Sequence, residues 1–161
     1  MLDNRKGLTL IELVVTVAIL GILATLILPL SQMTAKRMKE MELRRNLRVI
    51  RTAIDDFKKA YDKAVDDKKI ISSMNKSGCP EKLQVLVEGY DFGGLYAYKK
   101  KFLRKIPIDP FNPPAKGEDP KWGMRSYNDD PDSSNWGGED VYDVYSLSDE
   151  TAIDGSKYKD W

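Results

Sequence analysis

The chain has 161 residues, with 26 lysines and arginines, 25 aspartates and glutamates, and no histidine. Histidine is the commonest general base, and the sequence also contains no glycine-rich phosphate loop and no nucleophile elbow, so we expect no enzyme. Residues 36–76 hold thirteen basic and seven acidic side chains, a net of +6, whereas residues 118–161 hold four and twelve, a net of −8. So acidic a C-terminal part argues against a nucleic-acid-binding protein. The single cysteine, Cys79, excludes an intrachain disulfide, and we assign it no function.

An uncharged apolar run begins close to the N-terminus. Residues 13–30 contain no charged side chain, and their only hydroxyl groups are those of two threonines. A helix of about 18 such residues approaches the roughly 30 Å thickness of a bilayer's hydrocarbon core, so we predict a transmembrane helix over residues 8–30. Arg5 and Lys6 precede it and predict a cytoplasmic N-terminus. A secretory signal peptide fits less well, because its apolar region is shorter and ends in a small-residue cleavage site.

Glu12 places a carboxylate one turn into this apolar helix, which costs free energy unless the charge is balanced. In one interpretation Glu12 lies at the membrane interface, where the positive field of a helix N-terminus stabilises it. In the other, its partner is a positive charge that processing creates. Cutting the bond between Gly7 and Leu8 would produce such a charge, the α-amine of Leu8, in the same chain or in a neighbouring subunit.

The run Lys-Gly-Leu-Thr-Leu-Ile-Glu-Leu over residues 6–13 resembles the processing and assembly motif of type IV pilins and of the pseudopilins of type II secretion. The resemblance implies that a prepilin peptidase removes the leader, residues 1–7, by cutting after Gly7, and then N-methylates Leu8. It also implies that Glu12 pairs with the N-terminus of an adjacent subunit during filament assembly. The family usually has phenylalanine at the position of Leu8.

Beyond this run the pattern turns amphipathic, and we predict that the helix continues over residues 31–65, with a kink at Pro29. Apolar side chains recur at alternating spacings of four and three residues, which is a helical stripe. The stripe consists of Leu43, Leu47, Ile50, Ile54, Phe57, Tyr61 and Ala64. Two interpretations stay open: a face on which a small domain folds back, or a coiled-coil seam with a partner.

Residues 66–161 are predicted to form a globular α+β head. We expect a polar connection, a short helix that begins at Pro80, and two antiparallel strands that pack on the long helix. The expected ranges are 66–79 for the connection, 80–88 for the helix, and 122–127 and 141–147 for the strands. Between the helix and the strands, residues 102–113 are rich in proline and predicted to be extended. This segment is similar to one that precedes the short sheet of the major pseudopilin.

The acidic C-terminal segment is the only candidate metal site. From its residues alone, a solvated acidic turn is the better interpretation, and the spacing does not match an EF-hand loop. However, residues 144–161 resemble the calcium-binding end of major pseudopilins. The resemblance implies calcium held by Asp154, then Glu150 and Asp149, together with the main-chain carbonyl of Leu147.

On this resemblance we expect a structural subunit of a periplasmic pseudopilus, a homo-oligomeric helical filament that drives protein export by a type II secretion system. Its expected partners are the prepilin peptidase, the inner-membrane secretion platform and the minor pseudopilins. We place the protein in the bacterial inner membrane as a single-pass chain, with a cytoplasmic N-terminus and a periplasmic head. One alternative is a type IV pilin that forms a surface pilus, and another is a monomeric membrane-tethered binding domain. The proline-rich segment and the acidic end favour the pseudopilin.

Overall fold

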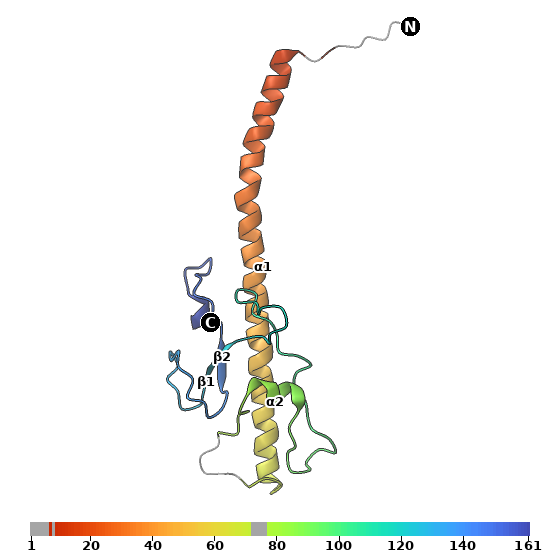
Figure 1. Ribbon diagram of the computed structural model, residues 1–161, viewed down its shortest axis with the longest axis vertical. Helices are drawn as coiled ribbons and strands as arrows, with labels where there is room; N and C mark the ends of the chain where they lie inside the picture. The colour runs from red at the N-terminus through yellow and green to blue at the C-terminus, as the bar shows by residue number, and fades with distance from the viewer. Residues whose placement is uncertain (1–6, 8, 72–76) are drawn as a thin grey trace, which may run out of the picture. The chain divides into compact units, whose positions relative to one another are not determined.

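The computed structural model describes residues 7, 9–71 and 77–161, without the side chains of residues 25–30. Its elements are the helix α1 (Leu10–Asp66), the short helix α2 (Leu83–Glu88), the strands β1 (Gly123–Arg125) and β2 (Asp143–Tyr145), and the 3-10 helix η1 (Tyr158–Asp160) (Figure 1). The chain divides into two compact units, Met1–Met38 and Lys39–Trp161. The predicted α+β class is confirmed, because a long N-terminal helix is combined with a two-stranded antiparallel sheet.

In the first unit, the large apolar side chains of α1 are exposed on every side. The ten described from Leu10 to Leu23 have exposed fractions between 47% and 83%. As far as side chains are described, no helix combines the length and the apolar character that a membrane span requires. The predicted span over residues 8–30 extends beyond this description, because residue 8 and the side chains of residues 25–30 lie outside it. The predicted kink at Pro29 lies outside it as well.

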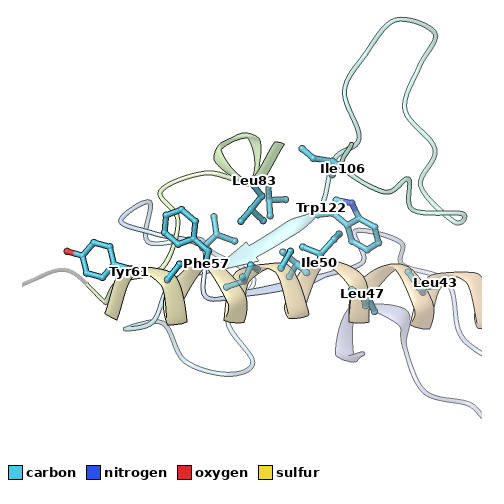
Figure 2. Packing of buried hydrophobic residues seen from close by; sticks show 14 of the residues in the cluster. Leu43, Leu47, Ile50, Phe57, Tyr61, Leu83, Ile106 and Trp122 are labelled. Atoms are coloured by element: carbon cyan, nitrogen blue, oxygen red, sulfur yellow. The ribbon is translucent and has the colours of Figure 1, made fainter. Parts of the chain in front are cut away.

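The second unit is built on the C-terminal half of α1. All seven residues of the predicted apolar stripe are buried, with exposed fractions of 8% or less. The stripe contacts side chains from several later segments, including Leu83 on α2, Ile106 in the proline-rich segment and Trp122 before β1 (Figure 2). Burying a large aliphatic or aromatic side chain contributes about 1.5–3 kcal/mol. The stripe is therefore the face on which the head folds back, as the first interpretation predicted.

α1 ends close to the predicted position, in a turn that satisfies its last carbonyl groups. The amide of Lys68 donates to the carbonyl of Val65 at 2.9 Å, and the amide of Lys69 donates to the carbonyl of Ala64 at 2.8 Å. This pair of bonds is a Schellman motif, in which the first residue after the C-cap adopts a left-handed conformation. Lys68 has that conformation, with φ 56°. The packing explains Gly93 too: a Cβ there would lie 2.3 Å from the carbonyl oxygen of Lys69.

The short helix begins later than predicted. α2 starts at Leu83, and Lys82 before it is extended, with φ −150°. Pro80 does not open the helix, because it lies alongside another segment: its carbonyl accepts a hydrogen bond from the amide of Val141 at 2.8 Å. A tertiary hydrogen bond thus overrides the local preference of proline for the first helical position.

The two strands pair in the predicted antiparallel sense, but each has only three residues. The ladder of main-chain hydrogen bonds stops after β1, because side-chain carboxylates accept the next two main-chain amides. The Asp129 carboxylate accepts the amide of Ser126 at 2.7 Å, and the Asp140 carboxylate accepts the amide of Tyr127 at 2.9 Å. Gly123 in β1 faces Tyr145 so closely that a Cβ would lie 2.3 Å from the ring.

The proline-rich segment contains neither helix nor strand, as predicted, but it is not extended throughout: it turns after Asp109, whose carbonyl accepts the amide of Asn112 at 3.2 Å. Two polar contacts hold the segment in place. The indole of Trp122 donates to the carbonyl of Pro107 at 2.9 Å, and the side-chain amide of Asn46 on α1 donates to the carbonyl of Ile108 at 2.9 Å. Asp109 is buried in this segment, and its carboxylate accepts the hydroxyl of Ser146 at 2.6 Å. These contacts connect α1, the proline-rich segment and the end of β2.

Candidate processing and assembly site

Gly7, the predicted cleavage position, is exposed, and a Cβ built on it would meet no atom within 4 Å among the residues described. Leu8, the predicted site of methylation, lies outside the described residues. Thr9 follows and adjoins the first residue of α1. Nothing in the described fold therefore requires glycine at position 7 for steric reasons.

Thr9 caps the N-terminus of α1. Its carbonyl accepts the amide of Leu13 at 3.1 Å, which is the first bond of the helix, and its hydroxyl accepts the amide of Glu12 at 3.3 Å. Threonine at the cap with glutamate three residues later is the pattern of a capping box. This role of Thr9 was not predicted, although the run Thr-Leu-Ile-Glu displays the pattern. The cap explains why the helix begins at Leu10.

Glu12 lies in the first turn of α1 and is exposed. The helix N-terminus carries a partial positive charge there, which favours a carboxylate by about 0.3–1 kcal/mol. The next basic residue along the chain is Lys36, 24 residues further on. That separation corresponds to about 36 Å of helix, far beyond the reach of an ion pair. Residues 7–35 contain no basic side chain, and Lys36 is too far along the helix to neutralise the carboxylate of Glu12.

At the other end of the chain, the four predicted calcium ligands are spread along an exposed segment. Asp149, Glu150 and Asp154 are exposed, and the side chain of Leu147 is about half exposed. Calcium requires six to eight oxygens around one point. Among the residues that the structure describes, no three carboxylate or thiol side chains gather as they would around a metal ion. The ligands do not fit calcium as they are arranged here, and calcium binding stays a prediction.

The carboxylate of Asp154 already has other partners. One oxygen accepts the hydroxyl of Ser156 at 2.6 Å and its amide at 2.9 Å, and the other lies 3.4 Å from the guanidinium of Arg44. The hydrogen bonds from Ser156 are the main reason that the pKa of Asp154 is lowered, and the charge of Arg44 adds to the effect. Asp154 is therefore held as an anion by its own loop.

Arg51, a half-exposed arginine on α1, has a role that was not predicted either. Its guanidinium donates to the carboxylate of Asp143 at 2.7 Å, to the carbonyl of Val144 at 3.0 Å and to the carbonyl of Trp161 at 2.5 Å. A charge-assisted hydrogen bond is stronger than a neutral one. One side chain of the long helix thus holds β2 and the last residue of the chain. No local pattern marks Arg51, because its partners are about ninety residues or more away.

Cys79 is half-buried beside a small cavity of about 80 Å³, which Phe57, Tyr61 and Asp140 also line. Burial raises the pKa of its thiol above the ordinary value, although a hydrogen bond with Ser77 opposes the shift. A thiol with a raised pKa is a poor nucleophile and a poor metal ligand at neutral pH. The environment of Cys79 is that of a structural residue.

Comparison with known families identifies the N-terminal segment. A family model described as the prokaryotic N-terminal methylation motif matches residues 2–28, which include Gly7, Leu8, Glu12 and most of the apolar run. Neither a curated protein nor a solved structure matches the chain. The motif implies processing by a prepilin peptidase and assembly into a filament. The chain thus carries a prokaryotic N-terminal methylation motif, which indicates a type IV pilin-like protein.

Proposed function

We propose that this protein is a structural subunit of a periplasmic pseudopilus, which drives protein export by a type II secretion system. In this proposal the prepilin peptidase removes residues 1–7 and methylates Leu8. The apolar part of α1 then anchors the subunit in the inner membrane, with the head in the periplasm. Subunits associate into a helical filament, in which the secretion platform and minor pseudopilins are the other partners.

The observation that carries the proposal is the isolation of Glu12. An acid in an apolar helix is costly unless a positive charge balances it. Residues 7–35 contain no basic side chain, and Lys36 is 24 residues further along the helix than Glu12. The α-amine of a processed neighbouring subunit would supply the missing charge. Because that partner is on another copy, a single charge pair would link each subunit to the next.

The exposed apolar surface of the first unit supports the same proposal. From Leu10 to Leu23 the large side chains described are at least 47% exposed. A contiguous apolar surface of this kind marks contact with a membrane or with other proteins. The apolar surface of a filament subunit contacts lipid before assembly and the apolar helices of neighbouring subunits afterwards.

The mass of the N-terminal peptide of protein recovered from membranes tests the processing step. We expect a peptide that begins at Leu8 and carries one additional methyl group. Gly7→Val should leave the leader attached, because a β-branched side chain would occupy the peptidase's cleavage position. Gly21→Ala is the matched control, since a Cβ at Gly21 also meets no atom within 4 Å among the described residues. A wild-type protein that retains residues 1–7 in its working state would refute the proposal.

A surface pilus is the second candidate, and the head gives two reasons to rank it lower. The proline-rich segment precedes the sheet, and a single cysteine excludes the terminal disulfide loop that is common in pilins. The two candidates differ in where the fibre is found. Shearing intact cells should release little of this protein, and deleting its gene should stop export of folded proteins; abundant sheared fibres with normal export would favour the pilus.

The alternative of another class is a monomeric membrane-tethered binding domain. Such a domain needs its anchor but not the charge of Glu12. Chemical crosslinking in membranes separates the two, because a filament subunit gives a ladder of oligomers and a tethered monomer does not.

A further inference from the structure

The C-terminal loop, which we define as residues 147–161, folds back on itself. Thr151 and Lys157 form an isolated antiparallel bridge, and the amide of Ala152 donates to the carbonyl of Ser156 at 2.8 Å. Gly155 lies at the turn with φ +88°, a conformation that favours glycine. Local bonds therefore give the loop its shape before any ion is considered.

Glu40 on α1 fixes the loop at two points. One oxygen of its carboxylate accepts the amide of Ile153 at 2.8 Å and the hydroxyl of Tyr158 at 3.0 Å. Tyr158 is fully buried, and its ring stacks on Phe111 with centroids 4.0 Å apart. The pKa of Tyr158 is raised, chiefly by burial and then by the hydrogen bond with Glu40. The phenol is therefore a stable donor to Glu40 at neutral pH.

Arg44 lies one turn beyond Glu40 and makes the complementary contacts. Its guanidinium lies 3.4 Å from the carboxylate of Asp154 and 4.1 Å from the centre of the Trp161 ring. The indole of Trp161 in turn donates to the hydroxyl of Ser156 at 2.7 Å. Residues four apart on a helix share a face, so Glu40 and Arg44 present one negative and one positive group to the same loop.

These contacts occupy the groups that a calcium ion would need. Asp154 is the first predicted ligand, and both of its oxygens are engaged, one with Ser156 and the other with Arg44. An ion that took Asp154 would have to displace a guanidinium and gather Glu150 and Asp149, which are exposed. In this chain Arg44 supplies the positive charge opposite the loop's central carboxylate.

We propose that Glu40 and Arg44 hold the C-terminal loop on α1, and that the loop keeps its structure without calcium. Glu40 and Arg44 are positioning residues, whose role is to fix a surface of the head. The inference concerns the fold of the head and stands whether or not the chain forms a pseudopilus. The family resemblance implies that calcium holds this loop. In the proposal made here, the side chains of Glu40 and Arg44 on α1 hold it instead.

Hydrogen exchange of the full chain in detergent micelles, followed by mass spectrometry of peptides from residues 150–161, tests the proposal. We expect the same exchange rate with a calcium chelator, with millimolar calcium and with millimolar magnesium. Asp149→Asn and Glu150→Gln should leave the rate unchanged, because neither side chain holds the loop in this proposal. The proposal would be overturned if calcium, but not magnesium, slowed exchange in the loop and if the two variants abolished this slowing.

The anchoring residues are tested in the same experiment. Glu40→Ala removes two hydrogen bonds and should speed exchange in the loop roughly tenfold. Arg44→Gln removes an exposed ion pair and a cation–π contact, and should speed it about threefold. Arg45→Gln is the matched control, an exposed arginine on the same turn, and should have no effect. If Glu40→Ala leaves exchange in the loop at the wild-type rate while the rest of the head stays folded, α1 does not anchor the loop.

Discussion

Two stretches of the same helix differ in how their apolar side chains are covered. From Leu10 to Leu23 the large apolar side chains described are 47–83% exposed, whereas the stripe from Leu43 to Ala64 is at most 8% exposed. Both stretches are helical, and both are rich in aliphatic residues. In the second stretch the apolar residues occupy one face and the rest of the same chain covers them. In the first they surround the helix, so no single face of one small domain would suffice to cover them.

The difference shows that the two stretches of α1 are stabilised by different contacts. The second stretch is stabilised by tertiary packing within the chain, which is the usual source of helical stability in proteins. The first stretch is stabilised by its surroundings, which we propose are lipid and then neighbouring subunits. Four variants sharpen this comparison, and each is paired with a control on the same helix or in the same head.

The largest expected effect concerns assembly and lies in the first stretch. Glu12→Leu removes the charge that we propose pairs with a neighbour's N-terminal amine. Leaving one member of a buried ion pair unpaired costs about 3–5 kcal/mol, which corresponds to more than a hundredfold in subunit affinity. Crosslinked oligomers in membranes should therefore disappear, while the head unfolds at the wild-type temperature. Glu42→Ala, an exposed glutamate within the second unit, should assemble normally.

Two leucines of α1 test the comparison directly. Leu47 is 2% exposed and Leu20 is 63% exposed. Leu47→Ala should lower the free energy of unfolding of the head by about 2–5 kcal/mol, because it leaves a cavity in the core. Leu20→Ala should change it by less than about 0.5 kcal/mol. Urea denaturation in detergent, followed by tryptophan fluorescence, measures both, and similar losses for the two variants would contradict the division.

Arg51 and Arg48 test the polar side of the second stretch. Arg51→Met removes the charge-assisted bonds to Asp143 and to two main-chain carbonyls, and should cost about 1–2 kcal/mol in the free energy of unfolding. Arg48 is exposed on the same helix, and Arg48→Met should cost less than about 0.5 kcal/mol. Denaturant unfolding of both variants measures the difference. Equal losses would show that Arg51 acts as an ordinary surface residue.

The smallest effect concerns the pH dependence of the head. Burial raises the pKa of Tyr158, so the unfolded chain releases this proton at lower pH than the folded chain does. The unfolded state therefore gains stability as pH rises above about 10, and the head loses stability there. Tyr158→Phe should cost about 1 kcal/mol at neutral pH, through the lost hydrogen bond with Glu40, and should show a shallower loss above pH 10.

Thermal unfolding across this pH range measures the effect of Tyr158. Tyr142→Phe is the control, because Tyr142 is 50% exposed, and its curve should follow the wild type. If Tyr158→Phe and the wild type lose stability in parallel above pH 10, the phenol of Tyr158 is not protected by the fold.

The sequence by itself determined the features that depend on local pattern. The period of the apolar stripe predicted the buried face of α1, since residues at helical spacing share one side. The end of α1 near Val65 and the antiparallel sense of the two strands were also predicted. The run around Gly7 and Glu12 indicated the type IV pilin-like motif that the family model matches over residues 2–28. Each of these depends on residues close together in the chain.

Tertiary structure alone decided the features that depend on distant partners. Pro80 does not begin α2, because its carbonyl accepts the amide of Val141 from a distant segment. The strands stop after three residues, because the carboxylates of Asp129 and Asp140 accept the next main-chain amides. The roles of Glu40 and Arg44 could not be predicted either, because the loop they contact lies more than a hundred residues further on. Periodicity predicts which side of a helix or strand is buried, but only the folded chain determines which distant residues contact each other.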